Sequence, residues 1–259
     1  MSGVKSLKLY NQNGQLDPSK PFLPFGPLPS SNAYLIFGCY EIAKKNLVEL
    51  NLQLEWAELP TAEGGFADHY LGYGGGVNND SFKADFAVLV DGDWKPRDSR
   101  ERQRQTLFES ERGRGRVAAS IRLPVPLSRY AKIGESALTE EAFDYNLVTR
   151  AGFFRLALVE PASAFGHHEY ATLLTEVLSA NAKLKKAKST PNPPYTPTLN
   201  HLSLHYRARS TLCVARERAT QRSEEGRFYH LHPFGIEPIG VSTHAKPSFL
   251  LPQYGYEGN

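Results

Sequence analysis

Residues 50–56 read Leu50-Asn51-Leu52-Gln53-Leu54-Glu55-Trp56, and this stretch decides the fold class of the chain. The leucines and the tryptophan share one parity, whereas the polar residues between them share the other. A period of two is typical of a β-strand with one buried and one solvated face. The runs from Phe82 to Val90 and from Val117 to Leu123 alternate in the same way, and a turn signal follows each of them, Asp91-Gly92 and Pro124. Strands separated by turns predict a mainly β protein, an antiparallel β-sandwich.

A proline-rich segment precedes this strand and reads Pro21-Phe22-Leu23-Pro24-Phe25-Gly26-Pro27-Leu28-Pro29. Proline fixes φ and lacks an amide proton, so the segment cannot be a helix and is predicted to run extended along a surface. We therefore predict an extended N-terminal arm over residues 1–30. The tail contains a second Pro-Phe-Gly at residues 233–235 and then Tyr254-Gly255-Tyr256. Residues 216–259 are predicted to form an extended C-terminal segment.

One helix is predicted, from His167 to about Lys186. Its apolar residues fall on one face at helical spacing: Tyr170, Leu173, Leu174, Val177, Leu178 and Leu184. Glu169 in the first turn and the lysines at 183, 185 and 186 in the last turn complement the helix dipole. A stiff connector, Pro191-Asn192-Pro193-Pro194-Tyr195-Thr196-Pro197, follows the helix. The prediction is thus a sandwich over residues 31–215 with a helical excursion at about 163–198.

Composition and charge narrow the class of protein. The chain has 259 residues, with 30 Lys and Arg against 27 Asp and Glu, a balance that gives no indication of nucleic-acid binding. Apolar runs are far shorter than a membrane span, and no leader precedes them, so neither a span nor a secretion signal is predicted. Cys39 and Cys213 are interpreted as buried thiols in a reducing compartment, and a disulfide between them is the alternative.

Histidines are the first candidates for metal ligands, because the chain has eight of them. His167-His168-Glu169 is not a His-Glu-x-x-His motif, and His201 and His205 would lie roughly 13 Å apart on a strand. His230 and His232 are better spaced, but no matching acidic residue or cysteine accompanies them. Structural histidines are therefore preferred to a metal site, and no metal or other cofactor is predicted.

Catalytic motifs are likewise missing from the sequence. The glycine-rich run Gly72-Tyr73-Gly74-Gly75-Gly76 lacks the Gly-Lys-Ser/Thr ending of a phosphate-binding loop, so a surface loop is the preferred interpretation. No Gly-x-Ser-x-Gly occurs, and the stretch from Ser163 to His167, which places a serine near a histidine, is interpreted as the approach to a helix. We predict no catalytic residue and therefore no enzyme.

Seven arginines between Arg97 and Arg116 form the most basic stretch of the chain. Acidic residues interrupt it, and no row of aromatic residues accompanies it to stack bases. A solvated, mobile loop anchored by Leu107-Phe108 is the preferred interpretation. If this loop binds anything, an acidic protein surface is preferred to nucleic acid.

Aromatic residues outside one core often mark contacts with another protein. The predicted anchors, some in the core and some at subunit contacts, are Phe22, Phe25, Trp56, Trp94, Phe234, Tyr254 and Tyr256. The equal alternative is that each arm packs back on its own domain.

Several short segments also follow one another in a characteristic order. They are Lys20 to Pro27, Tyr34 to Gly38 with Glu41 and Lys45, Leu50 to Trp56, Phe82 to Trp94, Gly152 to Leu156, Phe165 to His167, Pro191 to Pro197, His232 to Gly235, Leu251 to Tyr254 and Tyr256 to Gly258. In this order they resemble the large baseplate-wedge proteins of the baseplate-J-like class. Those proteins belong to contractile injection systems such as the antifeeding prophage and the Photorhabdus virulence cassettes, relatives of contractile phage tails.

The resemblance implies a structural module that contacts other baseplate proteins in a symmetric multi-subunit assembly. It implies assembly in the bacterial cytoplasm and a place in a phage-tail-like particle, and it supplies no catalytic residue to transfer. Family members are much longer, so this chain is expected to be one domain of a larger protein or a shortened relative.

Two other functions remain open. A carbohydrate-binding or adhesive β-sandwich would use Tyr70, Tyr73 and Trp94 as a stacking platform. A hydrolase would need a pair of carboxylates, for which Asp91 and Asp93 are the candidates, although a turn is the preferred interpretation of that pair.

Overall fold

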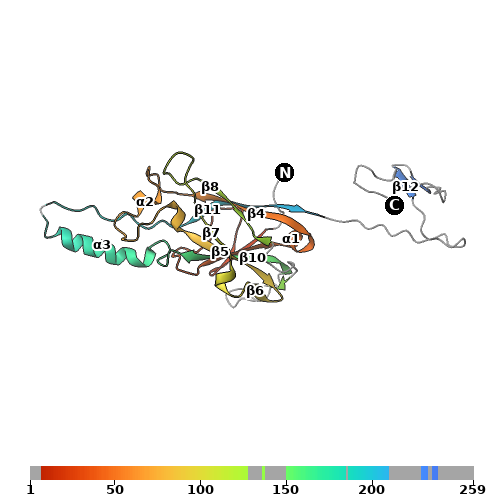
Figure 1. Ribbon diagram of the computed structural model, residues 1–259, viewed down its shortest axis with the longest axis horizontal. Coiled ribbons are helices and arrows are strands. Elements are labelled where there is room, and N and C mark those ends of the chain that lie inside the picture. The colour runs from red at the N-terminus through yellow and green to blue at the C-terminus, as the bar shows by residue number, and fades with distance from the viewer. Residues whose placement is uncertain are drawn as a thin grey trace. The chain divides into compact units, whose positions relative to one another are not determined.

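The computed structural model describes residues 7–127, 136–137, 150–184, 186–209, 229–232 and 235–238. The chain forms two compact units, Met1–Ser210 and Thr211–Asn259, which are described separately. The described residues are mainly β, with antiparallel sheets and few helices (Figure 1), which confirms the predicted fold class at this level.

Among the residues that the structure describes, eight strands of the first unit form a large sheet. Its main order is β2-β1-β3-β10-β5-β6, while β7 also pairs with β5 and β9 also pairs with β10. The strands are β1 (Lys8–Asn11), β2 (Gly14–Leu16), β3 (Tyr34–Cys39), β5 (Lys83–Val90), β6 (Asp93–Lys95), β7 (Arg104–Thr106), β9 (Ser136–Ala137) and β10 (Arg150–Glu160). Every pairing in this sheet is antiparallel.

Apolar residues of neighbouring strands lie opposite one another in the large sheet. Phe154 on β10 lies opposite Phe37 of β3 and Val88 of β5, and the Phe37 and Phe154 rings stack at 5.5 Å. The predicted hairpin after β5 is confirmed, because Asp91 and Gly92 take φ values of 51° and 81° between β5 and β6. Both positive values are those of the tight turn that an Asp-Gly pair favours.

A small sheet contains three strands in the order β11-β4-β8, namely β11 (Thr198–Ala208), β4 (Leu47–Ala57) and β8 (Ser120–Pro124). The parity read from residues 50–56 is confirmed, since Leu50, Leu52, Leu54 and Trp56 are all buried. Leu52 lies between Leu204 of β11 and Leu123 of β8, so each neighbouring strand continues the same apolar layer.

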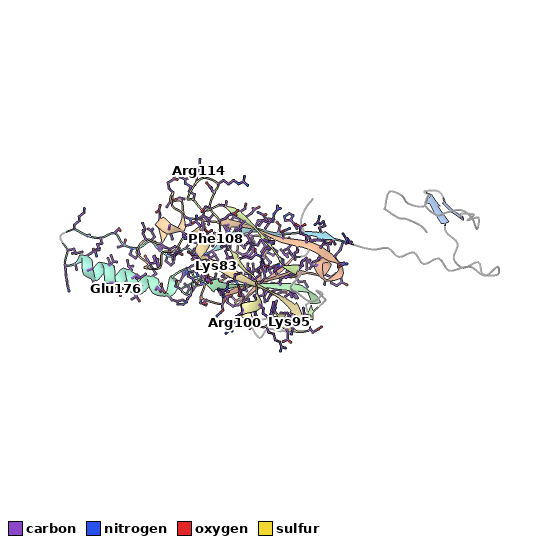
Figure 2. All side chains as sticks on the ribbon, viewed as in Figure 1. Lys83, Lys95, Arg100, Phe108, Arg114 and Glu176 are labelled. Atoms are coloured by element: carbon purple, nitrogen blue, oxygen red, sulfur yellow. The ribbon has the colours of Figure 1, made fainter. Side chains whose placement is uncertain are left out.

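One buried cluster contains side chains of both sheets. Trp56 packs on Phe108 with ring centroids 4.5 Å apart, and its Nε1–H donates to the Leu107 carbonyl at 3.0 Å. Leu107 and Phe108 are fully buried, which confirms them as the anchor of the arginine-rich stretch; Figure 2 labels Phe108 among the side chains of the body. That stretch is not a simple loop, because it contains β7 and the 3-10 turn η2 (Ser99–Glu101).

The N-terminal residues are partly built into the fold. Strands β1 and β2 pair as a hairpin within the stretch that was expected to be extended. The proline segment then runs back over the domain: the amide of Phe22 donates to the Leu199 carbonyl at 3.0 Å, and the amide of Leu199 donates back at 2.9 Å. Phe22 and Phe25 are buried, so this arm packs on its own domain.

The remaining elements are short apart from one helix. They are α1 (Tyr40–Lys44), α2 (Phe66–His69), the 3-10 turn η1 (Asn79–Ser81) and α3 (His167–Asn181). Cys39 is a buried free thiol whose sulfur accepts the Ile42 amide at the start of α1, while Cys213 lies outside the described residues. In the second unit, β12 (Tyr229–His232) pairs antiparallel with β13 (Gly235–Pro238).

Candidate functional site

The most prominent feature of the first unit is an excursion between β10 and β11. It consists of α3 and the extended connector that follows, and residues 163–197 are called the α3 arm from here on. Figure 1 shows α3 reaching beyond the two sheets while the connector returns beside it. The label of Glu176 in Figure 2 marks the same projecting helix.

Local sequence explains where α3 begins and ends. Gly166 precedes the helix with φ of 79°, and Glu169 lies in the first turn, where the helix dipole favours a negative charge. The helix ends at Asn181 and not near Lys186, so the expected lysines of the last turn lie beyond it. Asn181 closes the reversal, because its side chain accepts the Lys188 amide at 2.8 Å and donates to the Lys188 carbonyl at 2.9 Å.

A buried tyrosine holds the root of the α3 arm. The hydroxyl of Tyr70 donates to the Phe165 carbonyl at 3.0 Å and accepts the amide of Tyr195 at 3.2 Å. Phe165 lies just before α3 and Tyr195 lies at the end of the connector, so one hydroxyl joins both ends of the arm. Burial raises the pKa of Tyr70 above its ordinary range, which keeps this hydroxyl protonated.

A second tyrosine repeats the arrangement nearer the surface. Tyr73 stacks on Tyr170 of α3 with ring centroids 6.5 Å apart, and its hydroxyl donates to the Asn192 carbonyl at 2.6 Å. Burial raises the pKa of Tyr73 to about 12. The Asn192 side chain donates to the His69 carbonyl at 2.9 Å, which ties the connector to α2 as well.

Beyond this root the arm contributes nothing to the core. No residue of α3 is buried, and none belongs to the buried cluster that joins the sheets. Leu178 is 53% exposed and Leu184 is 45% exposed. Large apolar side chains that are exposed at the end of a projection are typical of a surface that contacts another molecule.

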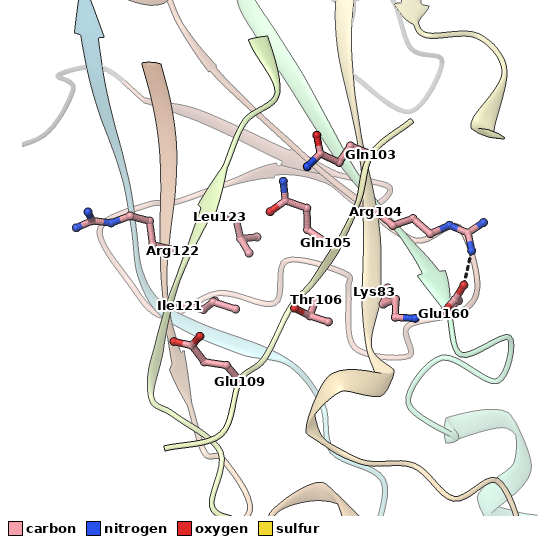
Figure 3. Close-up of a pocket in the computed structure, with 10 residues that line it drawn as sticks. All are labelled: Lys83, Gln103, Arg104, Gln105, Thr106, Glu109, Ile121, Arg122, Leu123 and Glu160. Carbon is pink, nitrogen blue, oxygen red and sulfur yellow. Dashed lines mark hydrogen bonds and ion pairs between the residues drawn. The ribbon is translucent and has the colours of Figure 1, made fainter. Parts of the chain in front are cut away.

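A groove of about 570 Å³ lies between the edge strands β7 and β8. Figure 3 shows Gln103, Gln105, Ile121 and Leu123 within it, and Arg104 directed toward Glu160 at its rim. Gln105 spans the gap, because its Nε2 donates to the Pro124 carbonyl at 2.6 Å. The gap between the two strand edges is therefore bridged by a side chain of the chain itself.

Charges beside the groove form an internal network. Glu160 contacts Lys83 at 2.8 Å and also pairs with Arg104, and the hydrogen bond from Lys83 lowers the pKa of Glu160. Asp85 is only 1% exposed, has no hydrogen bond to either carboxylate oxygen, and lies 3.6 Å from Arg104 Nε. Loss of hydration raises the pKa of Asp85, with Arg104 opposing the shift. Asp85 does not line the groove, so a molecule in the groove would not meet it.

The predicted anchors divide into three groups. Phe22, Phe25 and Trp56 are buried in the first unit, so none of them is available to a partner. Trp94 is half-buried on β6, with the guanidinium of Arg155 4.8 Å from its ring centroid. Phe234, Tyr254 and Tyr256 lie outside the described residues.

The sugar-stacking platform is not assembled by the residues expected to form it. Tyr70 is buried at the root of the α3 arm, and Tyr73 is engaged there with Tyr170 and Asn192. Trp94 instead packs against a separate apolar cluster that contains Phe153. These three side chains therefore do not share one exposed face.

The other candidate residues are mostly engaged within the chain. Asp93 pairs with Arg97, whose hydrogen bond lowers the pKa of Asp93, and Asp91 lies in the hairpin turn. In the basic stretch, Arg104 pairs with Glu160 and Arg116 pairs with Glu63. Across the described ranges, no group of three or more His, Cys, Asp or Glu is placed to hold a metal ion.

Sequence reasoning found the helix but missed its role. The helical spacing of Tyr170, Leu173, Leu174 and Val177 predicts one apolar face, and the structure leaves these residues half-buried. The available signal was the stiff connector, because a proline-rich segment is extended and cannot continue the helix.

Comparisons with known proteins add no family to this description. Neither a protein-family model nor a curated protein sequence matches the chain. Within the part of the chain that the structure describes, no helix is both long and apolar enough to cross a membrane.

Proposed function

We propose that this chain is a structural, non-enzymatic module of a baseplate wedge in a phage-tail-like contractile injection system. The two sheets pack as an antiparallel β-sandwich that serves as the scaffold, and α3 is its one long inserted helix. The α3 arm contacts a neighbouring subunit of a symmetric assembly. The particle is assembled in the bacterial cytoplasm.

The observation that carries this proposal is the α3 arm. A helix that buries no residue gains little stability for its own domain, because most helical stability in proteins comes from packing an apolar face. Two tyrosine hydroxyls nevertheless fix both ends of the arm to the body. A rigidly rooted projection with exposed leucines is suited to a contact with another protein.

The ordered succession of segments supports the choice of system. The resemblance to baseplate-J-like proteins includes Phe165-Gly166-His167 and Pro191 to Pro197, which are the two ends of the α3 arm. The burial of Phe25 and Trp56 supports the proposed sandwich, because both side chains belong to the hydrophobic cluster that contains residues of the two sheets.

The test is incorporation of the chain into particles. An affinity-tagged copy of the chain is expressed in a bacterium that produces phage-tail-like particles. The particles are then sedimented, and the amount of tagged chain in the particle fraction is measured. The double variant Leu178→Ser, Leu184→Ser removes the exposed apolar contact. The matched control is Leu28→Ser, Val48→Ser, which changes two apolar residues that are 65% and 46% exposed elsewhere.

We expect the wild-type chain and the matched control to co-sediment with particles. Loss of two leucine contacts should weaken incorporation by about 2 kcal/mol, or about 30-fold in affinity. A wild-type chain that is absent from purified particles would refute the proposal. Equal incorporation of the two double variants would show that the exposed leucines of the α3 arm do not form the contact.

A further inference from the structure

The tip of the α3 arm combines apolar and basic side chains. We define the tip as Leu178, Lys183, Leu184, Lys186 and Lys188, all of which are exposed. Lys183 and Leu184 follow the end of α3, and Lys186 and Lys188 lie where the chain reverses into the connector. The Asn181 to Lys188 hydrogen bonds hold this reversal, so the lysines belong to one small surface.

The lysines of the tip have no ionic partner among the described residues. Elsewhere in the described ranges, cations are commonly paired: Lys83 with Glu160, Arg116 with Glu63 and Arg207 with Glu49. The chain as a whole has a net charge of only +3, so an unpaired group of three ammonium ions is a marked local excess. Such an excess attracts carboxylates on an approaching surface.

We propose that the tip of the α3 arm docks on an acidic surface of a neighbouring polypeptide. Leu178 and Leu184 enter an apolar depression of that surface, and Lys183, Lys186 and Lys188 pair with carboxylates around its rim. This inference rests on the proposed function and names the chemistry of the partner that the same arm contacts. An apolar centre with a charged rim is the usual anatomy of a protein interface.

The composition of the tip favours a protein over a membrane or a nucleic acid. A helix that lies on a bilayer needs a long apolar face, whereas the exposed side of α3 carries Thr172, Thr175 and Ser179. Binding to single-stranded nucleic acid relies on aromatic side chains that stack on bases, and the tip has none. Exposed leucines beside lysines match an acidic protein surface with an apolar centre.

Carbodiimide cross-linking of purified particles tests this directly, because the reagent joins an ammonium group to a carboxylate that it already contacts. The chain contains its own positive control, since Lys83 lies 2.8 Å from Glu160 and should give an internal link. We expect Lys183, Lys186 or Lys188 to form links to aspartates or glutamates of another polypeptide. These links should fall at least about fivefold between 0.1 and 1 M salt, where exposed charges are screened.

Two triple variants separate charge from structure. Lys183→Arg, Lys186→Arg, Lys188→Arg keeps the charge but offers no reactive amine, so incorporation should stay normal while the links disappear. Lys183→Glu, Lys186→Glu, Lys188→Glu should lower incorporation about tenfold or more, which corresponds to 1.4 kcal/mol or more. Retained α-helical circular dichroism shows that both variants are folded.

The outcomes are distinct for the two proposals. If the chain is in the particle and forms the Lys83–Glu160 link, but the tip forms no link to another polypeptide, the acidic partner is refuted while the proposed function stands. Normal incorporation of the glutamate variant would refute it equally. Charge-dependent binding of the purified chain to phosphatidylserine vesicles or to duplex DNA, without protein links in particles, would replace the acidic protein by that ligand. If the chain is not in particles at all, the proposed function itself fails.

Discussion

Removal of the projecting part of the α3 arm, residues 171–190, should leave the free energy of unfolding of the domain almost unchanged. The proposed variant replaces residues 171–190 by Gly-Ser-Gly-Ser. Both cut ends lie at one side chain, because Tyr73 stacks on Tyr170 at 6.5 Å and its hydroxyl donates to Asn192. Four residues span roughly 13 Å when extended, which is enough to join these ends.

The magnitude follows from what the deleted residues contact. None of residues 171–190 belongs to the buried cluster, and no residue of α3 is buried, so the deletion removes no side chain of the core. Shortening a loop from about 20 residues to about 4 lowers its closure cost by about 1.4 kcal/mol. We therefore expect the free energy of unfolding to change by no more than about 1.5 kcal/mol.

Urea unfolding followed by far-ultraviolet circular dichroism measures this change, because this signal does not depend on a tryptophan and serves both variants. Trp56→Ala is the contrasting variant, because it leaves a cavity beside Phe108 and removes the hydrogen bond to Leu107, and it should cost about 3–5 kcal/mol. A loss of more than about 2 kcal/mol on deletion of the arm would mean that α3 supports the core, and the reasoning would be refuted.

Three further predictions concern single residues. Asp85→Asn should stabilise the domain at neutral pH, because the pKa of Asp85 is raised above its ordinary 3.8 in the folded state. The folded protein therefore binds this proton more tightly than the unfolded chain does, and it loses stability as the pH rises from the ordinary pKa to the raised one. Arg104, Arg102 and Glu160 are the charges that act on it, and chemical denaturation from pH 4 to 8 should show a flatter profile for the variant. An unchanged profile would show that another group carries the dependence. Tyr70→Phe should cost about 1–3 kcal/mol in urea unfolding, because it leaves the Phe165 carbonyl and the Tyr195 amide without their partner, and a cost below 0.5 kcal/mol would contradict that role. Gly38→Ala should lower the melting temperature sharply, since its Cβ would lie 2.3 Å from the Gly152 carbonyl oxygen on the paired strand. The control is Gly75→Ala, whose Cβ would meet only Val77 at 3.8 Å, and it should cost much less.

The regular strands were predictable from local sequence for a simple reason. In β4 each second side chain enters the core, so the alternation of Leu50 to Trp56 is visible without any partner strand. In β5 the alternating Ala84, Phe86 and Val88 enter the same core, but the residues between them are buried as well, which the alternation does not predict. The turn at Asp91-Gly92 was equally predictable, because few other residue pairs tolerate two positive φ values.

Elements that depend on distant partners were not predictable. Strand β7 lies at the edge of the large sheet, where Arg104 pairs with Glu160 and Gln105 donates to the Pro124 carbonyl. Its residues are all polar, so no apolar alternation predicts a strand there. The end of α3 depends on hydrogen bonds from Asn181 to a residue seven positions later. The fate of Phe22 depends on a pairing with Leu199, which no pattern in the proline segment indicates.

The candidate site shows the same division. The helix, its apolar spacing and the connector could be predicted from the sequence. The exposure of particular leucines could not, because it depends on where the arm is attached to the domain. The hydroxyls of Tyr70 and Tyr73 decide that, and both residues lie about a hundred positions before the arm.

The root of the α3 arm also determines how the domain would carry a mechanical load. The arm continues directly into β10, which is paired on both sides within the large sheet, and into β11 of the small sheet. A force applied at the tip therefore enters both sheets at once through two strands. On β10 that force would act along antiparallel ladders to β3 and β5, so several hydrogen bonds would resist it together instead of opening one after another. Tyr70 and Tyr73 hold the base of the arm, so a force on its tip would bend the arm about these two residues.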